Sequence, residues 1–199
     1  AHNNLGTVRR LLGDSKSAVA SHQRAIALRP DYAEAHHNLG VALNDLARHD
    51  EAVPALRTAI SLNPTLAATK YHLGNALLDS RAYDEAIASF RDAIESSPDF
   101  PEAHYNLANA LRDVGDLERA ANHYLSALSS KPNFAAAWQA ATSLNEFPVN
   151  KDTLDQLKKI REESALDDHE KCEIGFTLYQ ICKRLNHPED GFQYLQEAN

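Results

Sequence analysis

Four positions that lie 34 residues apart carry side chains able to donate and accept hydrogen bonds: Asn4, Asn38, His72 and Asn106. An asparagine amide has an N–H donor group and a carbonyl acceptor, so it can hold the N–H and the C=O of a peptide backbone together. A row of such amides could bind an extended chain largely regardless of its sequence. His72 interrupts the row at its middle.

Three further rows keep the same spacing and surround the first. The second is Thr7, Val41, Asn75 and Asn109; the third is Leu11, Asp45, Asp79 and Asp113; the flanking row is Asn3, His37, Tyr71 and Tyr105. The aspartates would add a preference for lysine, arginine or polar partners, and the tyrosines would offer flat contact area. The alternative is that these side chains are solvated or bond neighbouring helices, and bind nothing specific.

The ten histidines raise the question of a metal site, but their spacing does not support one. His36 and His37 fall in one repeat and His104 two repeats later, and no HExxH motif or Cys/His cluster accompanies them. We therefore predict packing roles for His2, His36 and His104, and no metal or cofactor.

Enzymatic chemistry finds even less support in the residue pattern. Gly6, Gly40 and Gly74 lie inside predicted helices rather than in a phosphate-binding loop, and no nucleophile stands beside a base at a recognisable spacing. The sequence predicts that the chain is not an enzyme.

Composition narrows the class of partner and the compartment. A net charge of −8 argues against nucleic-acid binding, which needs a basic face, and permits a polar or basic peptide. No apolar run reaches the roughly 20 residues of a bilayer span, and no signal peptide opens the chain. Cys172 and Cys182 fit neither a CxxC pair nor a zinc framework. We expect a cytoplasmic protein with reduced thiols and no membrane contact.

The elements that would position the polar rows follow from the 34-residue period. Prolines recur at Pro30, Pro64, Pro98 and Pro132, and alanines at Ala18, Ala52, Ala86 and Ala120 and at Ala25, Ala59, Ala93 and Ala127. Apolar residues spaced 3, 4 and 7 apart indicate helices. We predict helices over 3–14, 15–28, 33–46, 49–62, 67–80, 83–96, 101–114 and 117–130. Asp31 with Glu34 and Asp99 with Glu102 have the spacing of capping boxes.

These periodic residues resemble the tetratricopeptide repeat family. The resemblance rests on the Leu-Gly or Leu-Ala pair of each first helix, the small turn residues Gly13, Ala47 and Gly115, the second-helix alanines and the closing proline. It implies an all-α, right-handed α-solenoid of antiparallel helix pairs, with the polar rows lining a concave groove that binds peptides. The asparagine row also resembles that of the repeat arm of O-linked N-acetylglucosamine transferase. The family's carboxylate clamp for chaperone C-termini needs groove lysines and an arginine, which this chain lacks; Lys70 is one position off, facing the neighbouring helix.

The regular pattern ends near residue 142. We predict four repeats and the first helix of a fifth over residues 1–142, and an irregular helical tail over 143–199. The tail contains helices at about 151–164 and 168–185 and a degenerate repeat. In this repeat Leu178 takes the position of the first-helix leucine, and Gly191 and Ala198 take the positions of the two second-helix alanines. It weakly resembles the junction in bacterial proteins that join such repeats to a sulfotransferase. The chain lacks methionine and begins inside a helix, so we expect a fragment or processed form, truncated within a repeat.

These observations predict a protein-interaction module that binds an extended peptide or partner segment in the groove. One alternative is a non-catalytic, substrate-recruiting arm of a sulfotransferase-type or glycosyltransferase-type enzyme. Another is a scaffold that self-associates through its unfinished ends.

Overall fold

Every regular element in the described part of the chain is an α-helix, and the helices form two compact units. A computed structural model describes residues 1–163 and 166–197, and the units are Ala1–Ala110 and Leu111–Asn199. None of the described helices has the length and apolar character that a bilayer span requires. Residue 164, at the end of one predicted helix, and Ala198 lie outside the described residues.

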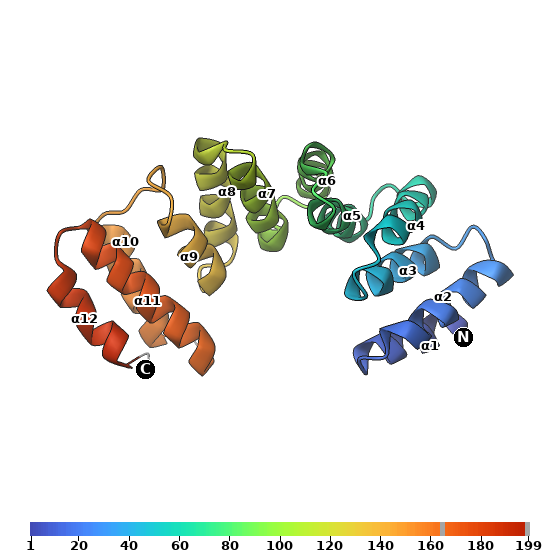
Figure 1. The fold of residues 1–199 in the computed structure, drawn as a ribbon, viewed down its shortest axis with the longest axis horizontal. Helices are drawn as coiled ribbons and strands as arrows, with labels where there is room; N and C mark the ends of the chain where they lie inside the picture. Colours follow the sequence, from blue (N-terminus) through green and yellow to red (C-terminus); the bar gives the residue numbers. More distant parts are fainter. Residues whose placement is uncertain (164–165, 198–199) are drawn as a thin grey trace. The chain divides into compact units, whose positions relative to one another are not determined.

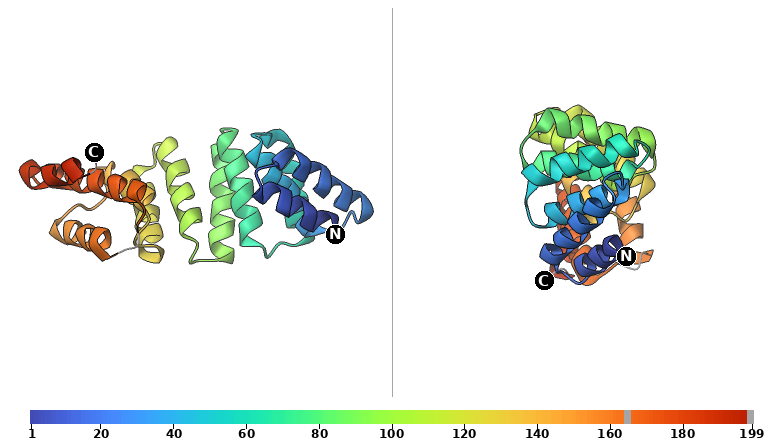
Figure 2. Two further views of the ribbon diagram at one scale, coloured as in Figure 1. Left: turned by 90° about the horizontal axis from the view of Figure 1, so that it is seen from below. Right: turned by 90° about the vertical axis from the view of Figure 1, so that its right-hand side faces the viewer.

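The first unit is built from helix pairs. Its helices are α1 (His2–Leu11), α2 (Ser15–Leu28), α3 (Ala33–Asp45), α4 (His49–Leu62), α5 (Ala67–Asp79), α6 (Tyr83–Ser96) and the start of α7 (Pro101–Asp113). In this unit α1 packs on α2, α3 on α4 and α5 on α6, and α2 and α4 also pack on the next pair (Figure 1). The pairs can be followed in two further views in Figure 2. The predicted α-solenoid is confirmed, and the predicted segments 15–28, 49–62 and 83–96 coincide with α2, α4 and α6.

Glycines let the two helices of each pair approach closely. A Cβ atom on Gly6 would lie 2.5 Å from the His22 ring, and one on Gly74 would lie 2.5 Å from the Phe90 ring. Gly40 meets Leu56 in the same way. The small residue in the first helix thus matches a large side chain on the second, so the two helices of the pair lie close together.

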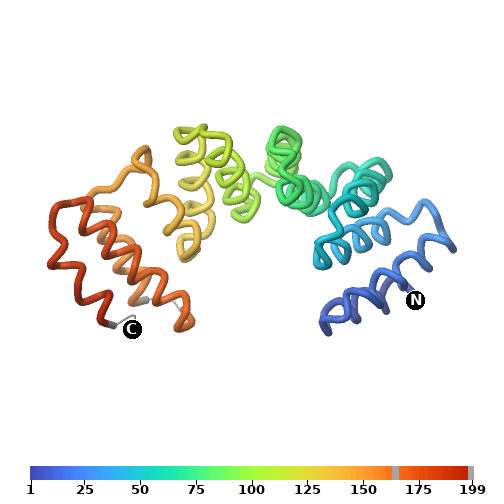
Figure 3. The backbone as a smooth tube through the Cα atoms, viewed as in Figure 1, coloured from blue at the N-terminus to red at the C-terminus, as the bar shows by residue number. Residues whose placement is uncertain are grey.

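The turns between paired helices share one backbone conformation. Gly13 and Gly115 have φ angles of 83° and 87°, and Ala47 and Arg81 occupy the same turn position with φ angles of 54° and 60° (Figure 3). Left-handed backbone disfavours residues with a Cβ. The turn at Gly13 ends α1 at Leu11, three residues before the predicted end at residue 14.

One predicted capping box is wrong. The N-cap residue of α3 is Tyr32 and carries no side-chain cap, so Asp31 does not cap this helix. Glu34 instead accepts hydrogen bonds from the Asn3 amide (3.1 Å) and the Tyr32 hydroxyl (3.0 Å). Both of its carboxylate oxygens are therefore engaged by side chains rather than by a backbone N–H at the start of the helix. A complete capping box occurs at the start of α11, between Asp167 and Glu170. The Asp99–Glu102 box stays a prediction.

The second unit contains the end of α7 and five further helices. These are α8 (Leu117–Ser130), α9 (Ala135–Thr142), α10 (Lys151–Glu163), α11 (Asp168–Arg184) and α12 (Pro188–Glu197). α11 contacts α9, α10 and α12. Leu157 and Ile160 of α10 are buried as predicted, whereas Leu154 is only half-buried. The predicted boundary after residue 142 stays a prediction. It marks where the repeat pattern ends, whereas the boundary after Ala110 separates two compact units.

Arg184, at the end of α11, holds the end of α9. Its Nη1 donates to the carbonyls of Thr142 and Leu144 at 2.9 Å each, and its Nη2 donates to those of Asn145 (3.4 Å) and Phe147 (3.2 Å). The last carbonyls of a helix lack partners within the helix. The guanidinium therefore stabilises the place where the regular repeats stop.

Candidate peptide-binding surface

The predicted groove residues of the first unit lie on its first helices, and most of them reach the surface. We use "predicted groove residues" for twelve of the sixteen side chains in the four rows, namely all except Asn3, Thr7, Leu11 and Val41. Asn4, Asp45 and Asp79 are exposed; His37, Asn38, Tyr71, His72, Asn75, Tyr105, Asn106 and Asn109 are half-buried; Asp113, which belongs to the second unit, is exposed. Val41 belongs to the second row, which the sequence predicts to line the groove. Val41 is buried, with 7% exposure, so the prediction that its side chain lines the groove is wrong.

The Asn38 amide joins two repeats. Its Nδ2 donates to Asn3 Oδ1 at 3.1 Å and approaches Thr7 Oγ1 at 3.5 Å, both on α1. Asn3 is itself buried, and its Oδ1 also accepts from His22 Nδ1 at 2.9 Å. Among the described residues, none donates to Asn38 Oδ1.

Asn106 repeats this arrangement two repeats later. Its Nδ2 donates to Asn75 Oδ1 at 2.8 Å and to the Tyr71 hydroxyl at 3.2 Å, both on α5. No donor among the described residues reaches its Oδ1. The donor groups of Asn38 and Asn106 thus hold neighbouring repeats together, as the alternative interpretation foresaw, while their carbonyl oxygens remain open to an incoming N–H group.

The middle of the asparagine row is occupied by neutral imidazole. The His72 ring packs edge-on against His37 (centroids 5.5 Å apart) and Tyr71 (5.2 Å). Burial lowers the pKa of His72 to about 4, and the neighbouring His37 and Arg10 contribute to the lowering. Burial also lowers the pKa of His37, whose Nδ1 lies 3.0 Å from Thr69 Oγ1. Both rings are therefore uncharged at neutral pH.

The tyrosines are only partly available as flat contacts. The Tyr71 ring packs against Phe100 (centroids 5.0 Å apart) and Phe90 (6.1 Å), and its hydroxyl accepts from Asn106. Tyr71 remains half-exposed, as does Tyr105. Contact with a ligand would use the open part of each ring.

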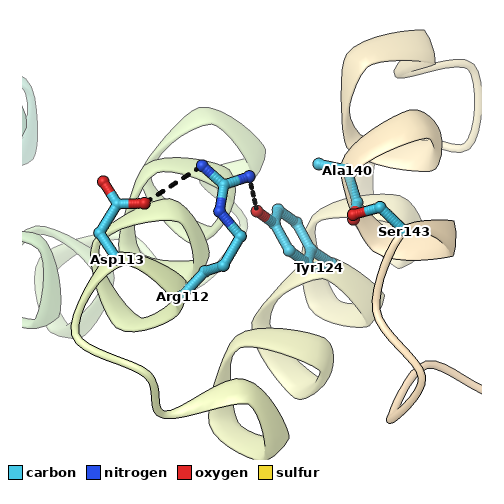
Figure 4. A network of polar contacts seen from close by, with 5 residues as sticks. All are labelled: Arg112, Asp113, Tyr124, Ala140 and Ser143. Carbon is cyan, nitrogen blue, oxygen red and sulfur yellow. Dashed lines mark hydrogen bonds and ion pairs between the residues drawn. The ribbon is translucent and has the colours of Figure 1, made fainter.

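The three aspartates differ in how much of each carboxylate is open. Asp45 accepts from Arg10 (3.4 Å) and Ser15 (3.3 Å), and its side chain is 38% exposed. The Asp79 side chain is 60% exposed, with His49 Nε2 3.9 Å away. In the second unit, Arg112 bridges Asp113 (3.3 Å) and the Tyr124 hydroxyl (3.3 Å) (Figure 4). Asp79 is therefore the carboxylate best able to meet a cationic side chain.

A periodic role that the sequence interpretation missed belongs to the residue six positions after each proline. His36 Nε2 donates to the Pro30 carbonyl at 2.8 Å, His104 Nε2 to Pro98 at 3.2 Å, and the Trp138 indole N–H to Pro132 at 2.7 Å. The prediction that His36 and His104 pack rather than bind metal agrees with these contacts. The shared spacing from proline was the signal in the sequence. Lys70, at the same position, donates to the Asp92 carbonyl and Ser96 Oγ of α6, as its predicted orientation requires.

Comparison with known families settles what the repeated pattern is. Profiles described as tetratricopeptide repeat match residues 33–66 and 71–141, and a profile described as TPR repeat matches residues 6–46. The chain belongs to the tetratricopeptide repeat family. Proteins of this repeat class serve as interaction modules, so a protein or peptide partner is the class of ligand to consider. A comparison with curated proteins gave no match.

Solved structures with the tetratricopeptide fold resemble most of the chain. PilF of Pseudomonas aeruginosa is 16% identical and aligns over 97% of this chain and 86% of its own, with a TM-score of 0.74. YrrB, described as a TPR protein with an unusual peptide-binding site, is 16% identical over 96% of this chain and 90% of its own, with a TM-score of 0.65. O-GlcNAc transferase of Thermobaculum terrenum is 29% identical over 67% of this chain but only 25% of its own, with a TM-score of 0.59.

Proposed function

We propose that this chain binds an extended peptide or partner segment along the predicted groove residues of its first unit. The observation that carries the proposal is the pair of half-buried amides, Asn38 and Asn106, whose donors are fixed by the preceding repeat and whose oxygens are open. A side chain that is already held in place loses little conformational entropy when it binds. The peptide-binding site named for YrrB, which shares the fold, supports this class of ligand.

The fixed donors define which part of a peptide each asparagine would contact. Asn38 Oδ1 and Asn106 Oδ1 would accept from backbone N–H groups, rather than holding an N–H and a C=O together as the sequence alone suggested. Asp79 would pair with a lysine or arginine of the ligand. The neutral imidazoles of His37 and His72 would add polar but uncharged contacts.

A second candidate function is a substrate-recruiting arm of a larger transferase. The similarity to O-GlcNAc transferase, which spans two thirds of this chain and a quarter of that enzyme, supports it. The arm would bind an acceptor protein by the same side chains. The sulfotransferase resemblance of the tail, including Phe147 and Phe192, stays a prediction.

The test is peptide affinity in a paired variant, Asn38→Ala with Asn106→Ala. Peptides selected from a random library displayed on phage would serve as probes, and their Kd would be measured by fluorescence polarisation. Because two acceptors are removed from the surface, we expect the Kd to rise by roughly tenfold or more. Asn122→Ala on α8, which removes an exposed amide elsewhere, is the matched control.

Far-UV circular dichroism would establish that the paired variant keeps its helices, since both amides also join repeats. A folded variant that binds the selected peptides as tightly as the parent chain would contradict the proposal. So would an equal loss of affinity in Asn122→Ala.

A further inference from the structure

A cavity of about 400 Å³ lies between α9 and α11, wholly within the second unit. The side chains that line it come from the last regular helix and from the degenerate repeat of the tail. They are Gln139, Thr142, Ser143, Asn145, Phe176, Thr177, Gln180 and Arg184. Small-molecule and side-chain pockets in proteins commonly begin at about 300 Å³, so the cavity is large enough for one bulky residue of a ligand.

Most of these lining residues occupy the same repeat positions as the predicted groove residues. Gln139 and Ser143 fall 34 residues after Tyr105 and Asn109. Aligning Leu178 with Leu107 places Phe176 at the position of Tyr105, Gln180 at that of Asn109, and Arg184 at that of Asp113. Apart from Thr142 and Asn145, the residues that line the cavity therefore stand at the positions of the predicted groove residues, with different side chains.

The change of side chains removes negative charge from the cavity. None of the described lining residues carries a carboxylate, because Arg184 stands where the regular repeats have aspartate. Its Nη atoms already donate to four backbone carbonyls at and just after the end of α9, so they cannot clamp an anion. The cavity thus offers no carboxylate to a basic ligand group and no open Nη donor to an acidic one.

What the cavity does offer is an aromatic surface and open amides. The Phe176 side chain is 43% exposed, unlike Ile174 and Leu178 beside it on α11, which are fully buried. Among the described residues, no hydrogen bond engages the side-chain amides of Gln139, Asn145 or Gln180. Amide groups complement the peptide backbone, and an exposed ring complements an apolar side chain.

We propose that the cavity between α9 and α11 binds an uncharged peptide segment, with an aromatic or aliphatic side chain against Phe176 and its backbone at Gln139 and Gln180. The inference rests on the proposed peptide-binding function and adds a second ligand chemistry to it. The first unit would select polar or cationic residues, whereas this cavity would select an apolar one.

The test uses the full chain, labelled with ¹⁵N, and a minimal probe. N-acetyl-phenylalanine methylamide carries one aromatic side chain between two amide groups and no charge. We expect it to shift the side-chain amide signals of Gln139 and Gln180 saturably. The lysine and glutamate analogues of the probe should not do so at the same concentrations.

Variants assign the binding to the cavity. Because Phe176 is exposed, Phe176→Ala should keep the fold and weaken probe binding by roughly tenfold. Phe192→Ala, which removes an exposed phenylalanine (56%) from α12 outside the cavity, is the matched control and should bind as the parent chain does. Gln180→Leu should also weaken binding while retaining side-chain volume.

Three results would overturn the inference: no saturable shift, equal shifts by the charged analogues, or unchanged affinity in Phe176→Ala. The paired Asn38→Ala and Asn106→Ala variant separates this inference from the proposed function. If that variant loses affinity for selected peptides but the probe never binds, the cavity inference fails alone. If the probe binds while the paired variant keeps its peptide affinity, the proposed use of the asparagines fails alone.

Discussion

His22 is the residue whose environment most clearly makes folding depend on pH. It is fully buried against Gly6, at a position where the next two repeats have Leu56 and Phe90. Burial lowers its pKa from 6.5 to about 4, with a smaller contribution from the positive charge of Arg10. The folded state therefore keeps the ring neutral at pH values where the unfolded chain binds a proton.

The lowered pKa of His22 predicts a loss of stability in mild acid. Because the unfolded state binds more protons, the free energy of unfolding should fall as the pH drops from about 6.5 to about 4, by up to roughly 3 kcal/mol for this residue. Urea denaturation followed by circular dichroism at several pH values would measure it. His72, whose pKa is also lowered to about 4, adds a loss in the same range.

Replacement of His22 isolates its share of the pH dependence. His22→Leu, which installs the residue of the next repeat, should make the fall in stability smaller, and Asn3 Oδ1 keeps its bond from Asn38. His169→Leu, which removes a histidine whose side chain is 81% exposed, serves as the control for the loss of an imidazole. If acid lowers the stability of the His22→Leu variant as much as that of the parent chain, the His22 ring of the parent chain is protonated in the folded state.

At the scale of the helix, α4 contains a residue that opposes its own secondary structure. Pro54 lies in the second turn, and it cannot donate the backbone hydrogen bond that the Asp50 carbonyl would accept. The equivalent positions of α2 and α6 are Ala20 and Ala88. Pro54 is exposed, so nothing in its packing offsets the missing bond.

Pro54→Ala should therefore stabilise the first unit. We expect a gain of about 2–3 kcal/mol, because alanine restores the bond and removes the ring clash. Thermal unfolding followed at 222 nm would report the change as a higher Tm. The reciprocal variant, Ala88→Pro in α6, should lower stability by a similar amount. A Pro54→Ala variant with an unchanged or lower Tm would mean that α4 is already relaxed around the proline.

The helices could be predicted from sequence because their determinants are local and repeated. The proline, the turn residue and the apolar stripe recur in each repeat, so errors at one helix end are small. Local spacing was insufficient where a partner from another repeat intervenes. Asp31 and Glu34 have capping-box spacing, yet Glu34 binds Asn3 from the preceding repeat.

The sequence predicts the face on which the candidate surface lies, but not its hydrogen bonds. The helical turn of about 100° per residue predicts that Asn38 and Asn106 share one side of the first helices. It could not show that their donors reach Asn3 and Asn75, because those distances depend on how closely α1 meets α3 and α5 meets α7. The cavity beside Phe176 was missed for a similar reason, since α9 and α11 are separated in sequence by all of α10.

At the scale of the whole molecule, charge determines which peptides approach fastest. The chain has 28 acidic and 20 basic residues and a net charge of −8. The negative electrostatic potential speeds the association of cationic ligands and slows the association of anionic ligands. Salt screens this potential over about 10 Å at 0.1 M. The exposed carboxylate of Asp79 adds a local negative charge that a cationic side chain can contact.

The proposed function therefore predicts salt-dependent association. For a selected peptide that contains lysines, the association rate measured by stopped-flow fluorescence should fall several-fold as NaCl is raised from about 50 to about 300 mM. The same peptide with glutamine in place of lysine should show little change, because it has no charge to steer. Asp79→Asn should weaken the lysine peptide mainly by faster dissociation, since it removes a contact and only one of many charges. If the lysine and glutamine peptides associate at equal rates in low salt, the acidic surface takes no part in the association of these peptides.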